Sequence, residues 1–498
     1  MLALDGSTLE GGGQLVRVAL SIAAICAVPV RIYNIRAGRG GGGNWHHKRA
    51  HNNGRRSNHQ GSSNHRGGGG GGDQGSIPPR VPAVAATKPK KAGGGLKESH
   101  LAALIWLARN CGAEVEGGEI GSQELTFEPA RRKRDGRWRA KGAAEDAEVI
   151  ELKNPGSVWL IWQAIFPYIV FSTLHTRSHR GSEAAPAFRI RLKGGTNVPK
   201  SPSSEYIQQV LLPLCERIGL PRVEVQVIRR GWTTGAAEIG EVEISVYHPE
   251  KSGKDNVMAK PEGGGAMGKF KGKLREDEVD KGDGAGFVLA PFQIAAPRPS
   301  TITSVSMTIL AGSPKTHSLL ESQLVTALHT VPTFSSPDLP IKLHPSSADS
   351  SDERRLYILL VAHTSDGYAL GRDYLGPGRK VTNDTERQRM VDEAVNTVVR
   401  ALARECERRS CVDEFAEDQL VVFQALADGA SSVDVGGDRG KNKEETGSLH
   451  TRTVRWVCRE MLGTVFDGLG GCEGRGMKGE GGFDEVKDSI EAPNIEQD

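Results

Sequence analysis

Residues 5–24 read DGSTLEGGGQLVRVALSIAA, and this stretch sets the pattern for much of the chain. LALDGS predicts a short strand and a turn, the apolar spacing from Gln14 to Cys26 predicts a helix, and VPVRIYNI predicts a second strand. The triplet Gly11–Gly13 between strand and helix is either a tight turn or a place where backbone N–H groups approach a phosphate. It is not a P-loop, because GxxxxGK[ST] occurs nowhere in the sequence.

The same alternation of helices and strands recurs along the chain. Residues 96–129 predict a helix followed by two strands, and residues 156–246 predict two helices and three strands. Residues 301–406 again predict two helices and three strands, and residues 413–463 predict two more helices. This recurrence predicts an α/β protein of stacked units with mixed sheets rather than one doubly wound sheet.

The composition limits the possible classes of protein. At 498 residues the chain is long enough for two or three domains. An apolar fraction of 37% and 63 glycines indicate ordered domains diluted by Gly-rich loops or tails. The net charge of +3 does not by itself indicate a nucleic-acid-binding protein, so any affinity for nucleic acid has to come from a local basic cluster.

Nothing in the sequence predicts a zinc site, a disulfide framework or a membrane segment. The seven cysteines form no CxxC pair, which favours a reducing compartment. The N-terminus lacks the pattern of a signal peptide, and the apolar run Leu15–Val28 is too short to span a bilayer. We therefore expect a soluble protein of the nucleus or cytosol with no membrane partner.

Three stretches are too polar or too rich in glycine to form a core. Residues 40–94 hold five histidines and nine Lys or Arg against the single acid Asp73, which predicts a disordered insertion. This insertion is either a basic arm that adds electrostatic affinity for a nucleic acid or the product of a gene-model artefact. Residues 249–285 predict a charged loop, and residues 478–498 predict a disordered tail.

Four charged residues near the N-terminus could carry chemistry, although each also has an ordinary structural explanation. Glu10 is either a metal ligand or a first-turn acid favoured by the helix dipole. Arg17, Arg36 and Arg39 could converge on a phosphate through their planar guanidinium groups, or they could be solvated surface charges.

The C-terminal third contains the other candidates. His450 lies in SLHTRT, between a polar loop and an amphipathic helix, and a lone histidine is more often structural than catalytic. Asp418 and Gln419 begin an apolar helix and could be simple capping residues. Local patterns alone decide no function.

The chain resembles the RNA 3'-terminal phosphate cyclase family in seven segments that follow the family's own order: DGSTLEGGGQLVRVALSIAA, PVRIYNIRAGR, HLAALIWLARNCGAEVEGGEIGSQELTFEP, GSVWLIWQ, LKGGTN, DEFAEDQLVVFQALADG and SLHTRT. The resemblance covers roughly residues 1–39, 95–245 and 355–477. The combination of EGGGQ with the late LHT histidine is typical of the catalytic members.

The resemblance implies a role for each matching residue. The implied catalytic residues are His450, which takes AMP, together with Glu10, Arg17, Arg36 and Arg39. The implied nucleotide-binding residues are Gly12, Gly13, Gln163, Pro202, Phe415, Asp418 and Gln419. The implied substrate-binding residues are Lys97 and His100, and Glu10 is also the implied metal ligand.

The resemblance also implies the reaction. The enzyme would be an ATP-dependent ligase that converts the 3'-terminal phosphate of an RNA into a 2',3'-cyclic phosphodiester. A covalent histidine–AMP and an RNA adenylate would form in turn, with release of pyrophosphate and AMP. ATP and a divalent metal, Mg or Mn, are the expected cofactors, and an RNA with a 3'-terminal phosphate is the expected partner. Imidazole suits the nucleophile's role because its ordinary pKa of about 6.5 leaves much of it neutral at cell pH.

The implied fold is a large domain of three βαβαββ-type repeats with a smaller α/β domain inserted late. We place the large domain at residues 1–245 and 411–477, and the inserted domain at residues 246–410.

The sequence departs from the family in four places. The segment PGLRPQHL reads GGGLKESHL, so Lys97 replaces an arginine and loses its bidentate fork, and Ser99 replaces a glutamine. The segment GYYPKGGGEV reads GWTTGAAEIGEV at residues 231–242, which removes a lysine. Phe415 stands where tyrosine is common, and the insertion at residues 40–94 separates two active-site segments.

Two other functions are compatible with the fold. A noncatalytic cyclase-like protein of ribosome biogenesis (rRNA processing) belongs to the same fold family, although the presence of His450, Glu10 and Arg17 argues against it. An enolpyruvyl transferase shares the fold type but uses no covalent histidine–AMP.

Overall fold

The computed structural model describes residues 1–37, 94–130, 147–174, 186–249, 286–296, 300–436 and 446–477. Residues 40–93 of the predicted disordered insertion, nearly all of the charged loop before residue 286, the C-terminal tail and Arg39 lie outside the described residues.

The first unit is a βαβαββ repeat. Its elements are β1 (Leu2–Asp5), α1 (Gly13–Cys26), β2 (Val30–Tyr33), α2 (Glu98–Cys111), β3 (Glu114–Glu116) and β4 (Leu125–Glu128). They form a four-stranded sheet in the order β1-β2-β4-β3, in which β1 and β2 are parallel and β4 is antiparallel to both of its neighbours. The helix predicted from Gln14 begins one residue earlier.

The second unit repeats this topology. Its elements are β5 (Glu148–Glu151), α3 (Val158–Thr173), β6 (Phe188–Gly194), α4 (Ser204–Tyr206), the π-helix η1 (Ile207–Leu211), α5 (Leu212–Arg217), β7 (Val223–Arg229) and β8 (Gly240–Val246). The sheet order β5-β6-β8-β7 matches that of the first unit. The single helix predicted after LKGGTN is in fact α4, η1 and α5, and Pro213, which has no N–H to continue the α-helical ladder, lies just after the π turn.

The third unit is made from two distant parts of the chain. Its elements are β9 (Gln293–Ile294), α8 (Glu414–Leu426), β15 (Ala430–Val433), α9 (Leu449–Leu462) and β16 (Gly471–Glu473). The three strands pair in the order β16-β15-β9, and β9 runs parallel to β15. Thus β9 belongs to this sheet although it lies within the range 246–410, and the division of the chain into domains stays a prediction.

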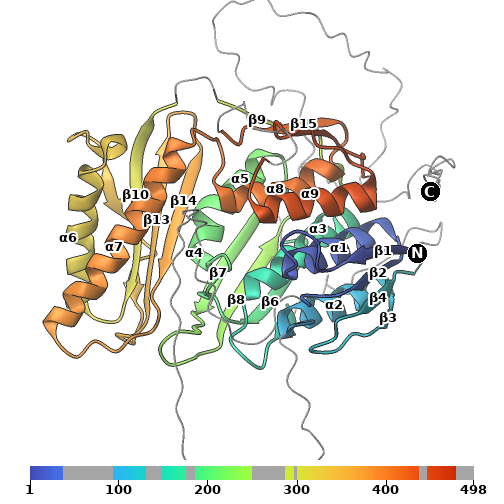
Figure 1. Ribbon diagram of the computed structural model, residues 1–498, viewed down its shortest axis with the longest axis horizontal. Helices are drawn as coiled ribbons and strands as arrows, with labels where there is room; N and C mark the ends of the chain where they lie inside the picture. Colours follow the sequence, from blue (N-terminus) through green and yellow to red (C-terminus); the bar gives the residue numbers. More distant parts are fainter. Residues whose placement is uncertain are drawn as a thin grey trace, which may run out of the picture.

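A separate α/β unit lies between β9 and α8 in the chain. Its elements are β10 (Ile302–Ala311), α6 (Pro314–His329), the 3-10 helix η2 (Pro332–Phe334), β11 (Ile341–Leu343), β12 (Ala348–Asp349), β13 (Leu356–Thr364), β14 (Ala369–Leu375) and α7 (Asp384–Glu407). Helices α6 and α7 lie side by side over one face of the sheet (Figure 1). Leu320, Leu324 and Leu402 contribute to a hydrophobic core of its own.

The other three units share one hydrophobic core. Helix α1 packs against α2, α3 and α9, and α9 also packs against α8, so helices from all three units meet (Figure 1). The predicted fold class, α/β with several small mixed sheets, is confirmed. Among the helices that the structure describes, none combines the length and the apolar character that a bilayer crossing requires.

Candidate active site

The N-terminal ends of three helices meet at one place: α1 and α2 of the first unit and α9 of the third. Helix α1 begins at Gly13, and a Cβ at that position would lie 2.3 Å from Nε2 of His100, which is in the first turn of α2. Glu10, just before α1, has its Oε2 3.8 Å from Nδ1 of His450 in the first turn of α9. The backbone N–H of Glu10 donates to the Oγ1 of Thr453 on α9 at 3.2 Å. The positive ends of three helix dipoles therefore point into a common region.

His450 is held by its helix rather than by packing of its ring. Ser448 is the N-cap of α9 and accepts a hydrogen bond from the backbone N–H of Thr451 at 3.1 Å. The His450 side chain is 52% exposed, whereas that of Glu10 is only 10% exposed. The imidazole thus faces solvent on one side and a mostly buried carboxylate on the other.

The glycines of the triplet allow close approaches that any side chain would prevent. A Cβ on Gly12 would lie 2.1 Å from Oε1 of Glu10, so the carboxylate occupies the space beside this residue. A Cβ on Gly13 would also lie 2.8 Å from Nη1 of Arg17. Gly11 has a φ of +57°, in the left-handed region. Glycine is therefore required at Gly12 and Gly13 by the nearby side chains, and it is favoured at Gly11 by the backbone conformation of the turn.

A buried hydrogen-bond network lies beneath the triplet. Gln14 Oε1 accepts from Nη2 of Arg17 at 2.7 Å and from Nε2 of Gln163 at 3.4 Å. Arg17 Nε donates to Oε1 of Gln163 at 2.7 Å. Gln14 Nε2 in turn donates to Oδ2 of Asp418 on α8 at 3.3 Å. This network joins residues from all three units, and Gln14, which has three partners in it, had no role in the sequence prediction.

Burial changes the charge behaviour of this network. Burial lowers the pKa of Arg17 to about 10, although the carboxylates of Glu10 and Asp418 oppose the shift. Burial raises the pKa of Asp418 to about 7, opposed by a hydrogen bond from Gln419 and by the charge of Arg17. Asp418 therefore changes its protonation near neutral pH, and Arg17 remains a cation there.

His100 is neutral and presents a defined tautomer. Burial holds its pKa well below the usual value, and the positive charges of Arg17, Arg36 and Lys97 act in the same direction. Its Nδ1 accepts a hydrogen bond from the backbone N–H of Lys97 at 3.1 Å. In a neutral ring the proton is then on Nε2, the atom that faces Gly13. His100 is therefore a donor directed at the Gly-rich turn.

The remaining basic candidates surround this point. Arg36 is buried, has a φ of 53° and donates from Nη1 to the carbonyl of Gly95 at 3.4 Å. Lys97 is exposed at the N-cap of α2. Both act electrostatically on His100, so the structure places them near the site. Arg39 lies outside the described residues.

A pocket next to the network contains four of the predicted nucleotide-binding residues. Gln163, Pro202, Asp418 and Gln419 line it, together with the aromatic side chains of Trp159, Trp162, Phe166 and Phe423. Its cavity volume is about 30 Å³. A cavity needs about 10–15 Å³ of such space to hold one water molecule, so this one has room for about two. A nucleobase would therefore enter only after some of these side chains move.

Phe415 does not line this pocket. Its ring meets that of Tyr206 edge-on at 5.9 Å, and the guanidinium of Arg372 on β14 lies 4.4 Å from its centroid. Phe415, at the start of α8, thus directs its ring toward α4 and the separate α/β unit. The sequence prediction had not named the aromatic residues Trp159, Trp162 and Phe166, although the run VWLIWQAIF around Gln163 could have indicated an aromatic wall.

The fold and this site together define a mixed α/β protein with a histidine–carboxylate pair at converging helix N-termini. A sequence model described as RNA 3'-terminal phosphate cyclase matches residues 8–49 and 79–467. The chain therefore belongs to the RNA 3'-terminal phosphate cyclase family, as its motifs predict.

Two curated relatives with that name align over most of the chain, and a third aligns over about half of it. The RNA 3'-terminal phosphate cyclase of Desulfurococcus amylolyticus is 26% identical over 435 residues, which are 87% of this chain and 87% of the relative. That of Pyrococcus furiosus is 24% identical over 484 residues, 96% of this chain and 98% of the relative. That of Methylococcus capsulatus is 31% identical over 232 residues, 47% of this chain and 45% of the relative. The family model leaves residues 50–78, about half of the predicted insertion, unmatched.

Proposed function

We propose that the protein is an active RNA 3'-terminal phosphate cyclase that uses ATP and a covalent histidine–AMP intermediate at His450. The observation that carries the proposal is the position of the half-exposed His450 ring, 3.8 Å from the Glu10 carboxylate, where the N-termini of α1, α2 and α9 converge. Family membership and the names of the relatives support the reaction class.

The convergence suits a triphosphate. Helix N-termini attract anions through their unsatisfied N–H groups and their dipoles. The Nε2 proton of His100 and the buried Arg17 add a donor and a cation beside Gly13. These groups do not have to reorganise when charge builds up on the nonbridging oxygens of the phosphate during transfer.

His450 suits a nucleophile that has to reach a bound phosphate. Glu10 lies on the Nδ1 side of the ring, which leaves Nε2 to attack the α-phosphorus. The new N–P bond replaces the bond to the β-phosphate oxygen, and pyrophosphate leaves. A 3'-phosphate oxygen of the RNA then attacks the same phosphorus and breaks the N–P bond. Finally the 2'-hydroxyl attacks the 3'-phosphorus, loses its proton and expels AMP.

Glu10 is the residue that would hold a divalent metal. Within the described ranges no group of three or more His, Cys, Asp or Glu has metal-binding geometry. Mg²⁺ is often bound by one or two carboxylates together with substrate phosphates. Glu10 fits that role only if ATP completes the site, where Mg or Mn would neutralise phosphate charge.

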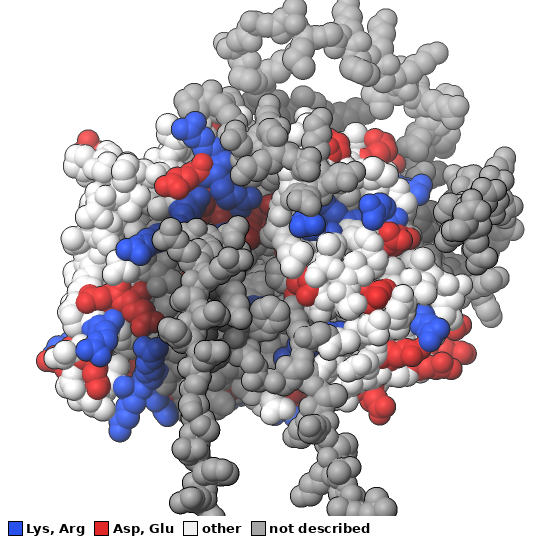
Figure 2. Space-filling view, viewed as in Figure 1, with Lys and Arg blue, Asp and Glu red and all other residues white. Residues whose placement is uncertain are grey.

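The adenine would bind in the pocket lined by Gln163, Pro202 and Asp418. Because that pocket is narrow, we expect the aromatic side chains beside Gln163 to shift when ATP binds. The RNA would approach from the α9 side. Figure 2 shows basic side chains over α9 and acidic ones gathered over β3 and β4, and an RNA strand avoids the latter.

Incubation with ATP labelled at the α-phosphate tests the proposal. Wild-type protein should gain an acid-labile label, and His450→Ala should gain none. His317→Ala, a histidine of α6 far from the site in the chain, is the matched control and should label like wild type. Equal labelling of wild type and His450→Ala, or none of either, would contradict the proposal. Phosphatase resistance of a 3'-phosphorylated RNA then reports cyclisation.

A noncatalytic role in ribosome biogenesis is the alternative. A protein with that role would take no label from ATP and would leave the RNA 3'-phosphate unchanged. An enolpyruvyl transferase would also remain unlabelled, because its reaction involves no histidine–AMP.

A further inference from the structure

We propose that Glu417 and Arg455 are positioning residues that hold the entry to α9 and thereby fix the reach of His450. The proposal rests on the proposed function of His450 and adds to it an internal ion-pair chain. This chain links the separate α/β unit to the helix that carries the nucleophile.

Glu417 is a buried carboxylate between two arginines. Its side chain is 2% exposed, and it lies on α8 one residue before Asp418. Oε2 accepts from Nη2 of Arg408 at 3.2 Å, and Oε1 accepts from Nη2 of Arg455 at 3.5 Å. Burial raises the pKa of Glu417, while both arginines oppose the shift. Such a group is costly to bury unless both partners are in place.

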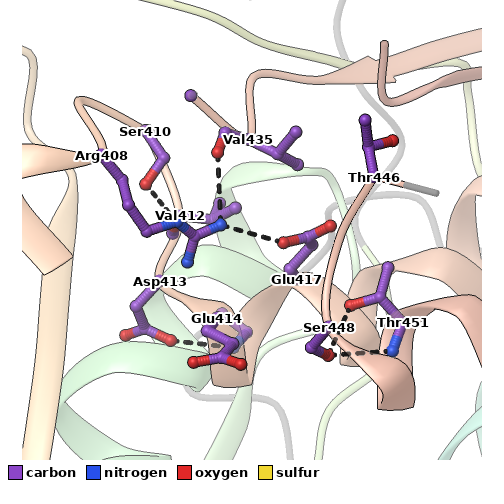
Figure 3. Close-up of polar contacts among 12 residues, drawn as sticks. Arg408, Ser410, Val412, Asp413, Glu414, Glu417, Val435, Thr446, Ser448 and Thr451 are labelled. Atoms are coloured by element: carbon purple, nitrogen blue, oxygen red, sulfur yellow. Dashed lines mark hydrogen bonds and ion pairs between the residues drawn. The ribbon is translucent and has the colours of Figure 1, made fainter. Parts of the chain in front are cut away.

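Both Glu417 and Arg455 contact the segment Thr446–Ser448, which directly precedes α9. Arg455 donates from Nη1 to the carbonyl oxygen of Thr446 at 3.0 Å. Gly447 has a φ of +94°, and a Cβ there would lie 2.8 Å from Oε1 of Glu417. The backbone therefore packs directly on the carboxylate, and only glycine allows this. Figure 3 shows Glu417 between Arg408 and this segment.

The chain of ion pairs continues into the separate α/β unit. Arg408 also donates from Nη1 to Oε1 of Glu405, near the end of α7, at 2.8 Å. Glu405 is 1% exposed and pairs through Oε2 with Arg372 on β14. The order Arg372–Glu405–Arg408–Glu417–Arg455 therefore connects that unit to the first turns of α9 without a break.

This chain of ion pairs can set the position of the His450 ring because the ring is not enclosed by other side chains on all sides. Its side chain is half-exposed, so the place of the ring follows from the backbone of the first turn of α9. That turn is held at its start by the Ser448 cap and by the contacts of Thr446 and Gly447 with Arg455 and Glu417. A displacement of about 1 Å at a nucleophile can slow a reaction about 100-fold.

The test measures the first half-reaction in the full-length protein. Glu417→Gln and Arg455→Met should lower the maximal rate of His450 labelling from α-labelled ATP about 10- to 100-fold. The ATP concentration for half-maximal rate should stay close to that of wild type, because neither residue is among those that line the nucleotide pocket. Arg455→Lys, which can keep only one of the two contacts, should fall between Arg455→Met and wild type.

Two controls separate positioning from stability. Glu393→Gln breaks the exposed ion pair between Glu393 on α7 and Arg379, which precedes this helix, and the variant should label like wild type. Leu324→Val lowers the melting temperature through the core of the separate unit, and it too should label at the wild-type rate at 25 °C. Hydrogen exchange of residues 446–452 should speed up in Arg455→Met and not in these two controls.

The outcomes distinguish this inference from the function on which it rests. Absence of label in wild type overturns both. Normal labelling of wild type together with wild-type maximal rates for Glu417→Gln and Arg455→Met overturns the positioning role alone. The positioning role is also overturned if the variants keep the wild-type maximal rate and only need more ATP to reach half of it. That result would indicate a role in nucleotide binding.

Discussion

Replacing Asp418 by asparagine should make the protein's stability less sensitive to a rise in pH from 5 to 8. The Asp418 carboxyl is 8% exposed, and its burial raises the pKa from 3.8 to about 7. Between these two values the folded state keeps the proton and the unfolded state has lost it. The folded state therefore binds more protons, and the free energy of unfolding falls as the pH rises from about 4 to 7.

The magnitude follows from the two pKa values. Each pKa unit corresponds to about 1.36 kcal/mol, so an ionised Asp418 costs about 4 kcal/mol of folding stability above pH 7. Of this, about 2.6 kcal/mol is lost between pH 5 and pH 8 for a folded pKa of about 7. The asparagine side chain of the variant cannot ionise, and its carbonyl oxygen can still accept a hydrogen bond from Gln14.

Urea unfolding at pH 5, 6, 7 and 8 measures the effect. The free energy of unfolding of Asp418→Asn minus that of wild type should increase with pH by about 2.6 kcal/mol across this range. Asp392→Asn, at an exposed carboxylate of α7, is the matched control for the loss of one negative charge. A difference for Asp418→Asn that does not change with pH would refute the reasoning, because the folded carboxyl would then be ionised throughout.

Three further predictions concern the same site. Gly13→Ala should destabilise the protein by about 1–3 kcal/mol and reduce His450 labelling, because the new methyl group would overlap His100; unchanged urea stability and labelling would contradict the close packing. His100→Gln should flatten the loss of stability below pH 6.5, by up to about 1.4 kcal/mol per pH unit, since unfolded His100 takes up a proton there and the buried ring does not; parallel stability curves for variant and wild type would show that the ring does become protonated when folded. Arg17→Lys should cost about 1–3 kcal/mol in urea unfolding, because lysine cannot donate to Gln14 and Gln163 in the same fork; a cost near zero would mean that the network is not formed in solution.

Much of the architecture follows from local patterns in the sequence. The helical spacing after Gln14 predicts α1 to within one residue, because an apolar run of this length next to a Gly-rich turn favours a buried helix. The residues of the family's motifs predict the family and the fold class, which are confirmed. The helix after LKGGTN is less regular than its pattern predicts, since Pro213 cannot donate to the helical ladder.

The site itself was only partly accessible from the sequence. Glu10 and His450 are 440 positions apart in the chain. No sequence pattern predicts that Oε2 of Glu10 lies 3.8 Å from Nδ1 of His450. Gln14 is part of the EGGGQ motif, but its role could not be predicted because its three hydrogen-bond partners come from three different units. Phe415 matched a pocket residue by its motif, yet it packs on Tyr206 and Arg372 at another surface of α8.

The sequence by itself determined the long helices, most of the strands and the side chains that are available for phosphate chemistry, because helix and strand formation depends largely on residues close together in the chain. The short strands β5, β9, β11, β12 and β16 were not predicted. The tertiary structure alone decided that three helix N-termini share one region, that Asp418 and Arg17 are buried and shifted in pKa, and that Glu417 lies against Gly447. These properties arise from burial and from contacts between distant segments, and burial exists only after the three units have packed into one core.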